Sequence, residues 1–313
     1  MRIKYGSYGI TALGSSAAVG VAGYIGGGYT GSVRVTRIDK ITFSADTKTT
    51  IAGVLSARKT KGAGFANSAV AGYAAGGYST DAADYVSTID RVAFPADTVT
   101  AISATLSSIN NAPIGFANSG VAGYAVSGYG GSYILSTDKI TFPAETRTTI
   151  SATLSVQRDS GSGFANSGVA GYAAGNDSLV TSINKITFPA DTLSTLSATL
   201  TTGAAETAGF ANSGVAGYVA GGNDSTDLDR VDKITFPADS KTVLSATLTS
   251  GVRSPAGFAN SGVAGYVAGG TDGSANLDRV DKITFPADGK STLSAVLTGT
   301  ITRCYGFADS GVL

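Results

Sequence analysis

The chain of 313 residues repeats one phrase, GFANSGVAGYVAGG, which stands in full at Gly257–Gly270. Near-copies begin at Gly64, Gly115, Gly163 and Gly209. Two further phrases follow each copy, with KITFPAD and LSATL as their commonest forms. The phenylalanine of the first of these recurs every 46 to 51 residues, at Phe43, Phe94, Phe142, Phe188, Phe236 and Phe285. A fixed period of this length is typical of repeat architectures, so the sequence predicts six equivalent units.

Each unit is predicted to form four short antiparallel strands, because turn residues recur about every ten positions and leave no room for a helix. In the clearest unit the expected strands are Ala256–Asn260, Val263–Ala268, Val280–Phe285 and Ser291–Leu297. Ser261 and Gly262 suit the first hairpin, and Pro286 ends the third strand by removing a ladder donor. Strict alternation fails between Val280 and Ile283, so we expect a bulge there or a strand that begins one residue later.

A single four-stranded sheet cannot bury both of its faces, whereas six sheets arranged radially cover one another. The sequence therefore predicts an all-β fold, a six-bladed β-propeller spanning residues 19–313. Residues 1–18 lie outside the period, and we expect either an arm that docks on another subunit or a strand lying on the propeller.

The first unit lacks a FAN strand at its N-terminal end, and the sixth FAN-like phrase, GFADSGVL, stands at Gly306–Leu313. We expect this C-terminal segment to complete the first blade, which would remove an open sheet edge. The competing segment Gly9–Ala18 lacks the Phe and the Asn of the phrase.

The order of phrases resembles the kelch repeat, in which a hydrophobic strand ends in tyrosine and a Gly pair and is followed by an aromatic residue before a Pro/Asp turn. The matching positions are Tyr266, Gly269, Gly270, Phe285, Pro286 and Asp288. The chain departs from that family in having Phe where the last strand usually carries Trp. The uniform repeats are also similar to β-propeller domains of bacteriophage virion proteins, such as tail or neck fibres. This second resemblance implies a location in a virion.

Composition excludes several classes of function. Lys and Arg number 22, as do Asp and Glu, so no net field attracts nucleic acid or an anionic membrane. The chain has no His and one Cys, which rules out a disulfide within the chain and leaves too few ligands for structural zinc. We expect no cofactor, no bound metal and no secretory signal or transmembrane segment.

Two polar positions recur in every unit, which favours structural roles over catalysis. The acid of the PAD phrase is Asp46, Asp97, Glu145, Asp191, Asp239 or Asp288, and we interpret it as a turn residue. The Asn of FAN is replaced by Asp309 in the last unit. It either shapes its own hairpin, the interpretation that we favour, or faces the axis in a ring of polar side chains.

The loops after the second and fourth strands vary most, and variable loops on a constant scaffold are usual binding sites. In the first three units they carry tyrosines, at Tyr29, Tyr78, Tyr85, Tyr129 and Tyr133. In the last three they carry acids, including Asp224, Asp227 and Asp272. The tyrosines suit sugars or protein partners, or they only pack the loops. The acidic loops form Asx-turns or, as a lesser alternative, bind calcium.

These patterns lead to an expected function without catalysis. The chain is expected to be a binding or structural module, a phage fibre component that contacts other virion proteins or a host surface glycan or protein receptor within a larger assembly. A cellular kelch-like scaffold and a carbohydrate-active enzyme that uses loop carboxylates are the alternatives.

Overall fold

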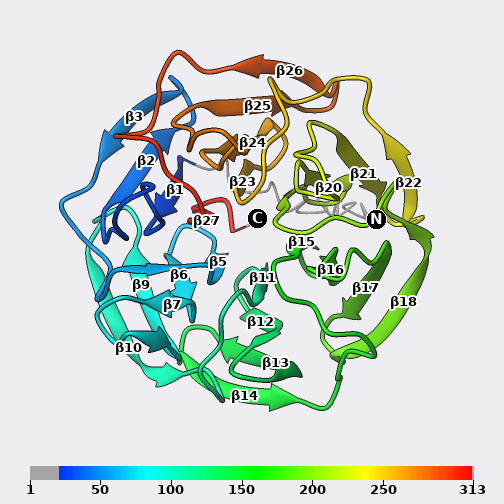
Figure 1. Ribbon diagram of the computed structural model, residues 1–313. Helices are drawn as coiled ribbons and strands as arrows, with labels where there is room; N and C mark the ends of the chain where they lie inside the picture. The colour runs from blue at the N-terminus through cyan, green and yellow to red at the C-terminus, as the bar shows by residue number, and fades with distance from the viewer. Residues whose placement is uncertain (1–20, 312–313) are drawn as a thin grey trace, which may run out of the picture.

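The computed structural model describes residues 21–311, and within them every regular element is a β-strand. The strands form antiparallel sheets arranged around a common centre in a propeller-like fold (Figure 1). The predicted N-terminal segment 1–18 lies outside the described residues.

Six of the sheets have four strands each, and we number them 1 to 6 along the chain. Sheet 1 has the order β27 (Tyr305–Ala308), β1 (Ala22–Gly26), β2 (Ile38–Thr42), β3 (Thr47–Thr50). Sheet 2 consists of β5 (Ala63–Asn67), β6 (Ala71–Ala75), β9 (Thr88–Ala93) and β10 (Val99–Thr105). Sheet 3 consists of β11 (Ile114–Asn118), β12 (Ala122–Tyr129), β13 (Tyr133–Thr141) and β14 (Thr146–Ile150).

The remaining three units repeat the same order. Sheet 4 consists of β15 (Ser162–Asn166), β16 (Ala170–Ala174), β17 (Ser182–Thr187) and β18 (Thr192–Thr199). Sheet 5 consists of β19 (Ala208–Asn212), β20 (Ala216–Ala220), β21 (Val231–Thr235) and β22 (Ser240–Val243). Sheet 6 consists of β23 (Ala256–Asn260), β24 (Ala264–Ala268), β25 (Val280–Thr284) and β26 (Gly289–Thr292).

The expectation of six sheets needs correction, because the described residues form seven. The additional sheet has three short strands, β4 (Lys59–Thr60), β7 (Tyr78–Ser79) and β8 (Asp84–Tyr85). In it the loop after β6 forms a hairpin, which pairs with the segment that leads into β5. Other units have the same pairing as isolated bridges, such as Tyr29 with Arg34 and with Thr302, so the additional sheet extends a pattern of the repeat.

The third and fourth strands of sheet 6 also differ from the prediction. Strand β25 pairs with β24 without a register shift from Val280 to Thr284, so the expected bulge is absent. Alternation fails for another reason: both faces of the strand are covered, and Asp281 is buried beside Val280. The fourth strand begins at Gly289 and ends at Thr292, before the apolar positions that suggested it.

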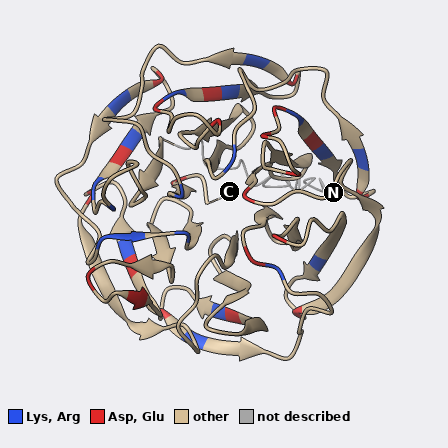
Figure 2. Cartoon of the chain, in the orientation of Figure 1, with Lys and Arg blue, Asp and Glu red and all other residues tan. Residues whose placement is uncertain are grey.

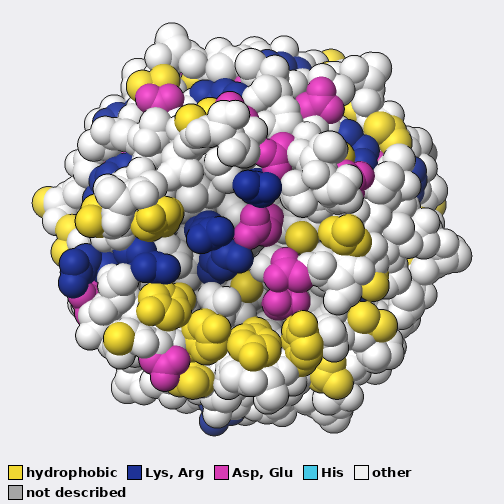
Figure 3. All heavy atoms as spheres, in the orientation of Figure 1, with side chains coloured by type: hydrophobic (Ala, Val, Ile, Leu, Met, Phe, Trp, Pro, Cys, Tyr) yellow, Lys and Arg dark blue, Asp and Glu magenta, His cyan; other side chains and the backbone are white. Residues whose placement is uncertain are grey.

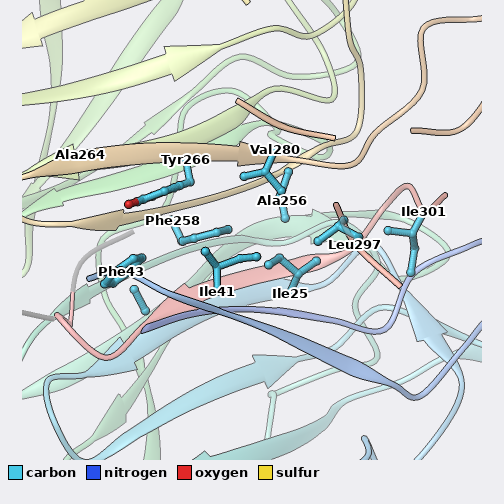
Figure 4. Close-up of a cluster of buried hydrophobic side chains, with 12 residues drawn as sticks. Ile25, Ile41, Phe43, Ala256, Phe258, Ala264, Tyr266, Val280, Leu297 and Ile301 are labelled. Atoms are coloured by element: carbon cyan, nitrogen blue, oxygen red, sulfur yellow. The ribbon is translucent and has the colours of Figure 1, made fainter. Parts of the chain in front are cut away.

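The two ends of the described chain meet in sheet 1. Strand β27 pairs antiparallel with β1, with Tyr24 opposite Phe307 and Gly26 opposite Tyr305. On the face of sheet 1 that lies against sheet 6, Ile25, Ile41 and Phe43 pack against side chains such as Phe258 and Tyr266 (Figure 4). The first and last units therefore share a hydrophobic core.

Glycine allows the sheets to approach one another closely near the centre. A Cβ on Gly265 would lie 2.0 Å from the ring of Phe210 in the preceding sheet, and the same contact recurs for the AGY glycine of each unit. On the first strand, a Cβ on Gly257 would lie 2.3 Å from the carbonyl oxygen of Gly209. The chain thus needs glycine at both positions because backbone and aromatic rings occupy the space of a side chain.

Neighbouring sheets are also joined by a repeated tyrosine, acid and cation. The hydroxyl of Tyr172 donates to Asp239 Oδ1 of the next sheet at 2.8 Å, and Lys185 Nζ lies 2.6 Å from Asp239 Oδ2. The acid lies in a turn at φ 53°, as the sequence suggested, but its inter-sheet role was not foreseen. Burial, together with this carboxylate, raises the pKa of the tyrosine well above its usual value.

The same link occurs between all six pairs of neighbouring sheets. The tyrosine and acid pairs are Tyr24 with Asp97, Tyr73 with Glu145, Tyr124 with Asp191, Tyr172 with Asp239, Tyr218 with Asp288 and Tyr266 with Asp46. The last of these connects sheet 6 to sheet 1. Figure 2 shows Lys or Arg residues along the third strands of the sheets, the strands that carry the cations of the links.

Candidate functional site

The variable loops meet on one face of the molecule because their backbones pair in a common pattern. In each unit the fifth residue after the tyrosine of the AGY phrase pairs through its backbone with a residue near the centre. This partner lies in the segment that leads into the first strand of a sheet. Tyr29 pairs with Thr302, Tyr129 with Asn111, and the amide of Asp177 donates to the carbonyl of Asp159 at 3.2 Å. We call this surface the loop face. Its equivalent positions are Tyr29, Tyr78, Tyr129, Asp177, Asn223 and Thr271.

Six residues surround the centre of the loop face and are called here the mouth residues. They are Lys61, Ala112, Ser160, Glu206, Ser254 and Arg303. The amide of each donates to the carbonyl of the one before it, over distances of 2.5 to 3.2 Å, and Lys61 donates to Arg303. All six have φ between 53° and 60°, a left-handed conformation that few residues adopt without a compensating contact.

A cavity of about 110 Å³ lies among the mouth residues and the glycines of the first strands. Lys61 Nζ and Glu206 Oε1, which belong to opposite units, lie 2.8 Å apart beside it. Burial opposes ionisation of Glu206, but the ammonium group of Lys61 and hydrogen bonds outweigh it and lower the pKa of this carboxyl. The two opposite charges therefore compensate each other beside the cavity.

A second, larger hollow of about 440 Å³ adjoins this cavity on the side of the last three units. Glu206 and Arg303 line both hollows. The polar lining of the larger one continues through Asp177, Asn223, Asp224, Ser225 and Arg253. Figure 3 shows basic and acidic side chains gathered around the centre of this face.

The predicted tyrosines come together in one row on the opposite half of the loop face. The ring centroids of Tyr78 and Tyr85 are 5.9 Å apart, those of Tyr85 and Tyr129 are 5.8 Å apart, and those of Tyr129 and Tyr133 are 5.4 Å apart, all edge to face. Tyr29 is connected to this row through Arg34. The guanidinium carbon of Arg34 lies 4.4 Å from the ring centroid of Tyr78 and 5.6 Å from that of Tyr29.

We call these five tyrosines and Arg34 the tyrosine row. Tyr133 keeps 49% of its surface exposed, and the other four rings are partly exposed. In Figure 3 hydrophobic side chains form an arc on one side of the central charges. The row presents several aromatic planes and hydroxyl groups to solvent, which is the chemistry that binds sugars and polar protein surfaces.

The three predicted acids are distributed differently. Asp224 lines the larger hollow and accepts hydrogen bonds from Thr202 and Thr226. Asp227 pairs with Arg253 at 3.4 Å. Asp272 accepts from the amides of its own turn, and these bonds lower its pKa. Within residues 21–311 no three His, Cys, Asp or Glu side chains lie close enough together to hold a metal ion.

A carboxyl pair that the sequence analysis did not identify lies beside the mouth residues. Asp159 is 9% exposed, and its Oδ1 atom has no hydrogen-bond partner among the described residues. Burial and the neighbouring Asp177 raise the pKa of Asp159 to about 6, against the opposing charge of Lys61. The backbone pairing of the two residues places Asp159 beside Asp177, which lines the larger hollow.

The six four-stranded sheets and the links between them are called here the frame. The FAN asparagines contribute to these links and do not form a site in the channel. Asn118 Oδ1 accepts from the amide of Gly168 at 2.9 Å, and Asn166 Oδ1 accepts from Gly214 at 2.9 Å. Each therefore stabilises the hairpin of the next sheet, whereas the sequence analysis favoured a role in its own hairpin. Asp309 differs, because its Oδ1 atom accepts from the amides of Val21 at 2.6 Å and Ala22 at 3.1 Å, at the start of the neighbouring strand of its own sheet.

Five residues of the loop face were not predicted from the sequence: Arg34, Lys61, Asp159, Glu206 and Arg303. One signal was present for the mouth residues, because Lys61, Glu206 and Arg303 all stand four positions before the FAN phenylalanine. No known protein family model matches the chain, and no curated protein matches it. Over residues 21–311 the structure contains no helix that is long and apolar enough to cross a membrane.

Proposed function

We propose that the chain is a non-enzymatic binding module built as a six-bladed β-propeller, with the six four-stranded sheets as blades and β27 closing the ring. The pairing of β27 with β1 and the link from Tyr266 to Asp46 support the closure. The kelch-like order of phrases supports the same architecture.

The binding surface in this proposal is the loop face, and the observation that carries it is the tyrosine row. Five tyrosines from three units converge on one patch, although the equivalent loops of the other units carry no aromatic residue. Nothing in the repeat requires aromatic side chains at these positions, because the units without them have the same backbone pairing. Exposed aromatic groups that the fold does not need are typical of binding surfaces.

The proposed setting is a virion fibre that contacts the surface of a bacterial host, and its support is the resemblance of the repeats to phage propeller domains. The chain would then be part of a larger assembly with other virion proteins. The loop face would point toward the host.

The proposal is tested by substituting Tyr78→Ala, Tyr85→Ala and Tyr133→Ala together. Labelled protein is incubated with host cells, and the bound fraction is measured by sedimentation. We expect binding to fall at least about tenfold, because each aromatic side chain at the centre of an interface contributes about 2 kcal/mol or more. The melting temperature should stay within a few degrees of the wild type.

Two controls make this test specific. The matched variant Tyr78→Phe, Tyr85→Phe and Tyr133→Phe keeps the aromatic planes and should retain most of the binding. Unchanged binding by the alanine variant would refute the tyrosine row as the site. Release of reducing ends from host polysaccharide, abolished by Asp159→Asn, would favour the carbohydrate-active enzyme instead.

A further inference from the structure

One cation that lines the larger hollow, Arg303, makes no direct side-chain hydrogen bond or ion pair within residues 21–311. Lys61 is paired with Glu206, Arg253 with Asp227, and Arg34 is stacked on Tyr78. The side chain of Arg303, in contrast, has no hydrogen bond or ion pair with any residue of the described chain, although its charge acts on Glu206 and helps to lower the pKa of that carboxyl. A half-buried guanidinium group in such a place is available to bind an anion in the bidentate geometry that carboxylates prefer.

Arg303 also lies where the two halves of the loop face meet. Its neighbour Thr302 exchanges backbone hydrogen bonds with Tyr29, at 2.8 and 3.0 Å, which connects it to the tyrosine row. Arg303 itself lines both the central cavity and the larger hollow. No tyrosine lines either hollow, so a ligand bound at Arg303 among the polar side chains would contact aromatic planes only where it extends past Thr302 toward Tyr29.

The rest of the hollow is suited to hydroxyl groups. The carboxylates of Asp177 and Asp224 only accept hydrogen bonds, the guanidinium groups only donate them, and Asn223 and Ser225 do both. Sugar hydroxyls donate and accept, so they can satisfy all three kinds of partner. A peptide rich in Asp and Glu would place several negative charges against these carboxylates, whereas a sugar with one carboxylate places a single charge at the one unpaired cation.

We propose that the hollow beside Arg303 binds an acidic sugar residue, of the uronic or sialic type, with its carboxylate on the Arg303 guanidinium and the adjoining sugars on the tyrosine row. The inference rests on the proposed function of the loop face and specifies its ligand. The hollow of about 440 Å³ falls within the range of about 300 to 1,000 Å³ that is usual for ligand pockets.

The experiment measures binding of the full chain to immobilised oligosaccharides that contain glucuronic acid or N-acetylneuraminic acid, and to the same sugars with their carboxyl groups reduced. We expect at least one acidic sugar to bind about tenfold or more tightly than its reduced form, as a charged hydrogen bond implies. Arg303→Gln should remove this preference without weakening binding of the reduced sugar. Arg303→Lys should restore part of it.

The control is Arg58→Gln, which removes the same charge from a guanidinium group that is already paired with Asp81 and lies outside the hollow. It should keep the full preference. Equal binding of acidic and reduced sugars, a preference that survives Arg303→Gln, or no binding to any sugar of the panel would overturn the inference. So would competition by a poly-glutamate peptide as effective as that of the acidic sugar.

The proposed function fails separately from this inference. If the triple tyrosine-to-alanine variant loses cell binding while acidic and reduced sugars bind the wild type alike, the loop face remains the binding surface and only the assignment to Arg303 falls. If the triple variant binds cells normally, the proposed function itself is wrong.

Discussion

The residues that link neighbouring sheets are nearly constant from unit to unit, whereas the residues of the loop face vary. Every pair of neighbouring sheets is joined by a tyrosine, an acid and a cation at the same positions, whereas the loop face carries Tyr at three equivalent positions and Asp, Asn or Thr at the other three. The backbone pairing under these loops is nevertheless the same. The comparison teaches that the frame constrains where the loop side chains lie, but not what they are.

The links themselves show how strongly the frame is constrained. Five of the six use Lys with Asp, and the exception uses Arg91 with Glu145, whose Nε and Oε1 atoms are 2.9 Å apart. Both residues of this pair differ from the Lys and Asp of the other links, although Arg91 and Glu145 are 54 positions apart in the sequence. The longer acid and the larger cation thus occur together, as expected of groups that must contact each other.

The largest effect is expected at the seam of the frame. Deleting residues 305–313 removes β27, exposes the edge of β1 and takes Phe307 out of the core that it shares with Tyr24 and Phe94. We expect no cooperative unfolding transition by circular dichroism, and aggregation in size-exclusion chromatography. A monomeric truncated protein with an unchanged melting temperature would show that the frame does not depend on this strand.

A smaller effect is expected when one link is broken within an intact frame. Asp239→Ala leaves the Lys185 ammonium group and the Tyr172 hydroxyl without their partner, which should lower the free energy of unfolding by about 2 kcal/mol. Asp224→Ala on the loop face is the matched control and should change it by less than about 0.5 kcal/mol. Urea titrations measure both, and equal effects would erase the distinction between the frame and the loop face.

The smallest change in the free energy of unfolding is expected for Asp159, which lies beside the mouth residues of the loop face. Its pKa of about 6 exceeds the ordinary 3.8, so the folded chain holds a proton that the unfolded chain releases. Stability contributed by the protonated form is present at low pH and is lost as the pH rises through this interval. Asp159→Asn mimics the protonated acid and should therefore be more stable than the wild type at pH 7.5, by about 1 to 2 kcal/mol.

The comparison of the two proteins at pH 3.5 serves as the internal control, because both side chains are then neutral and the difference should vanish. Thermal melts across the pH range measure it. A constant difference at every pH would mean that burial and the neighbouring Asp177 do not raise the pKa of Asp159.

Much of this frame could be predicted from the sequence because it is repeated. Five copies of one phrase, with a partial sixth at Gly306–Leu313, located the strands Ala256–Asn260 and Ala264–Ala268 to within one residue. The fourth strand was placed too late, since Leu293 and Leu297 alternate like strand residues although they lie in the segment after β26. Hydrophobic alternation records which side chains are buried, and a loop that packs on a sheet also buries every second residue.

The candidate site was predicted only in part, because its members come from loops that do not resemble one another. The tyrosines were recognised as residues of one face, but their contact through Arg34 depends on loop conformations that no repeat specifies. Asp159 and Asp177 are 18 positions apart and meet only through a backbone pair. The three-stranded sheet was missed for the same reason.

The pairing of Arg91 with Glu145 also limits how such a chain can change its number of units. A duplicated unit from elsewhere in the array carries an aspartate, which can pair with the lysine of the preceding unit, and a lysine, which can pair with the aspartate of the following unit. It therefore fits between most neighbours. If the same unit were inserted between sheets 2 and 3, its aspartate would pair with Arg91 and its lysine with Glu145. Growth or shrinkage of the array should therefore be tolerated at the other junctions and resisted at this one.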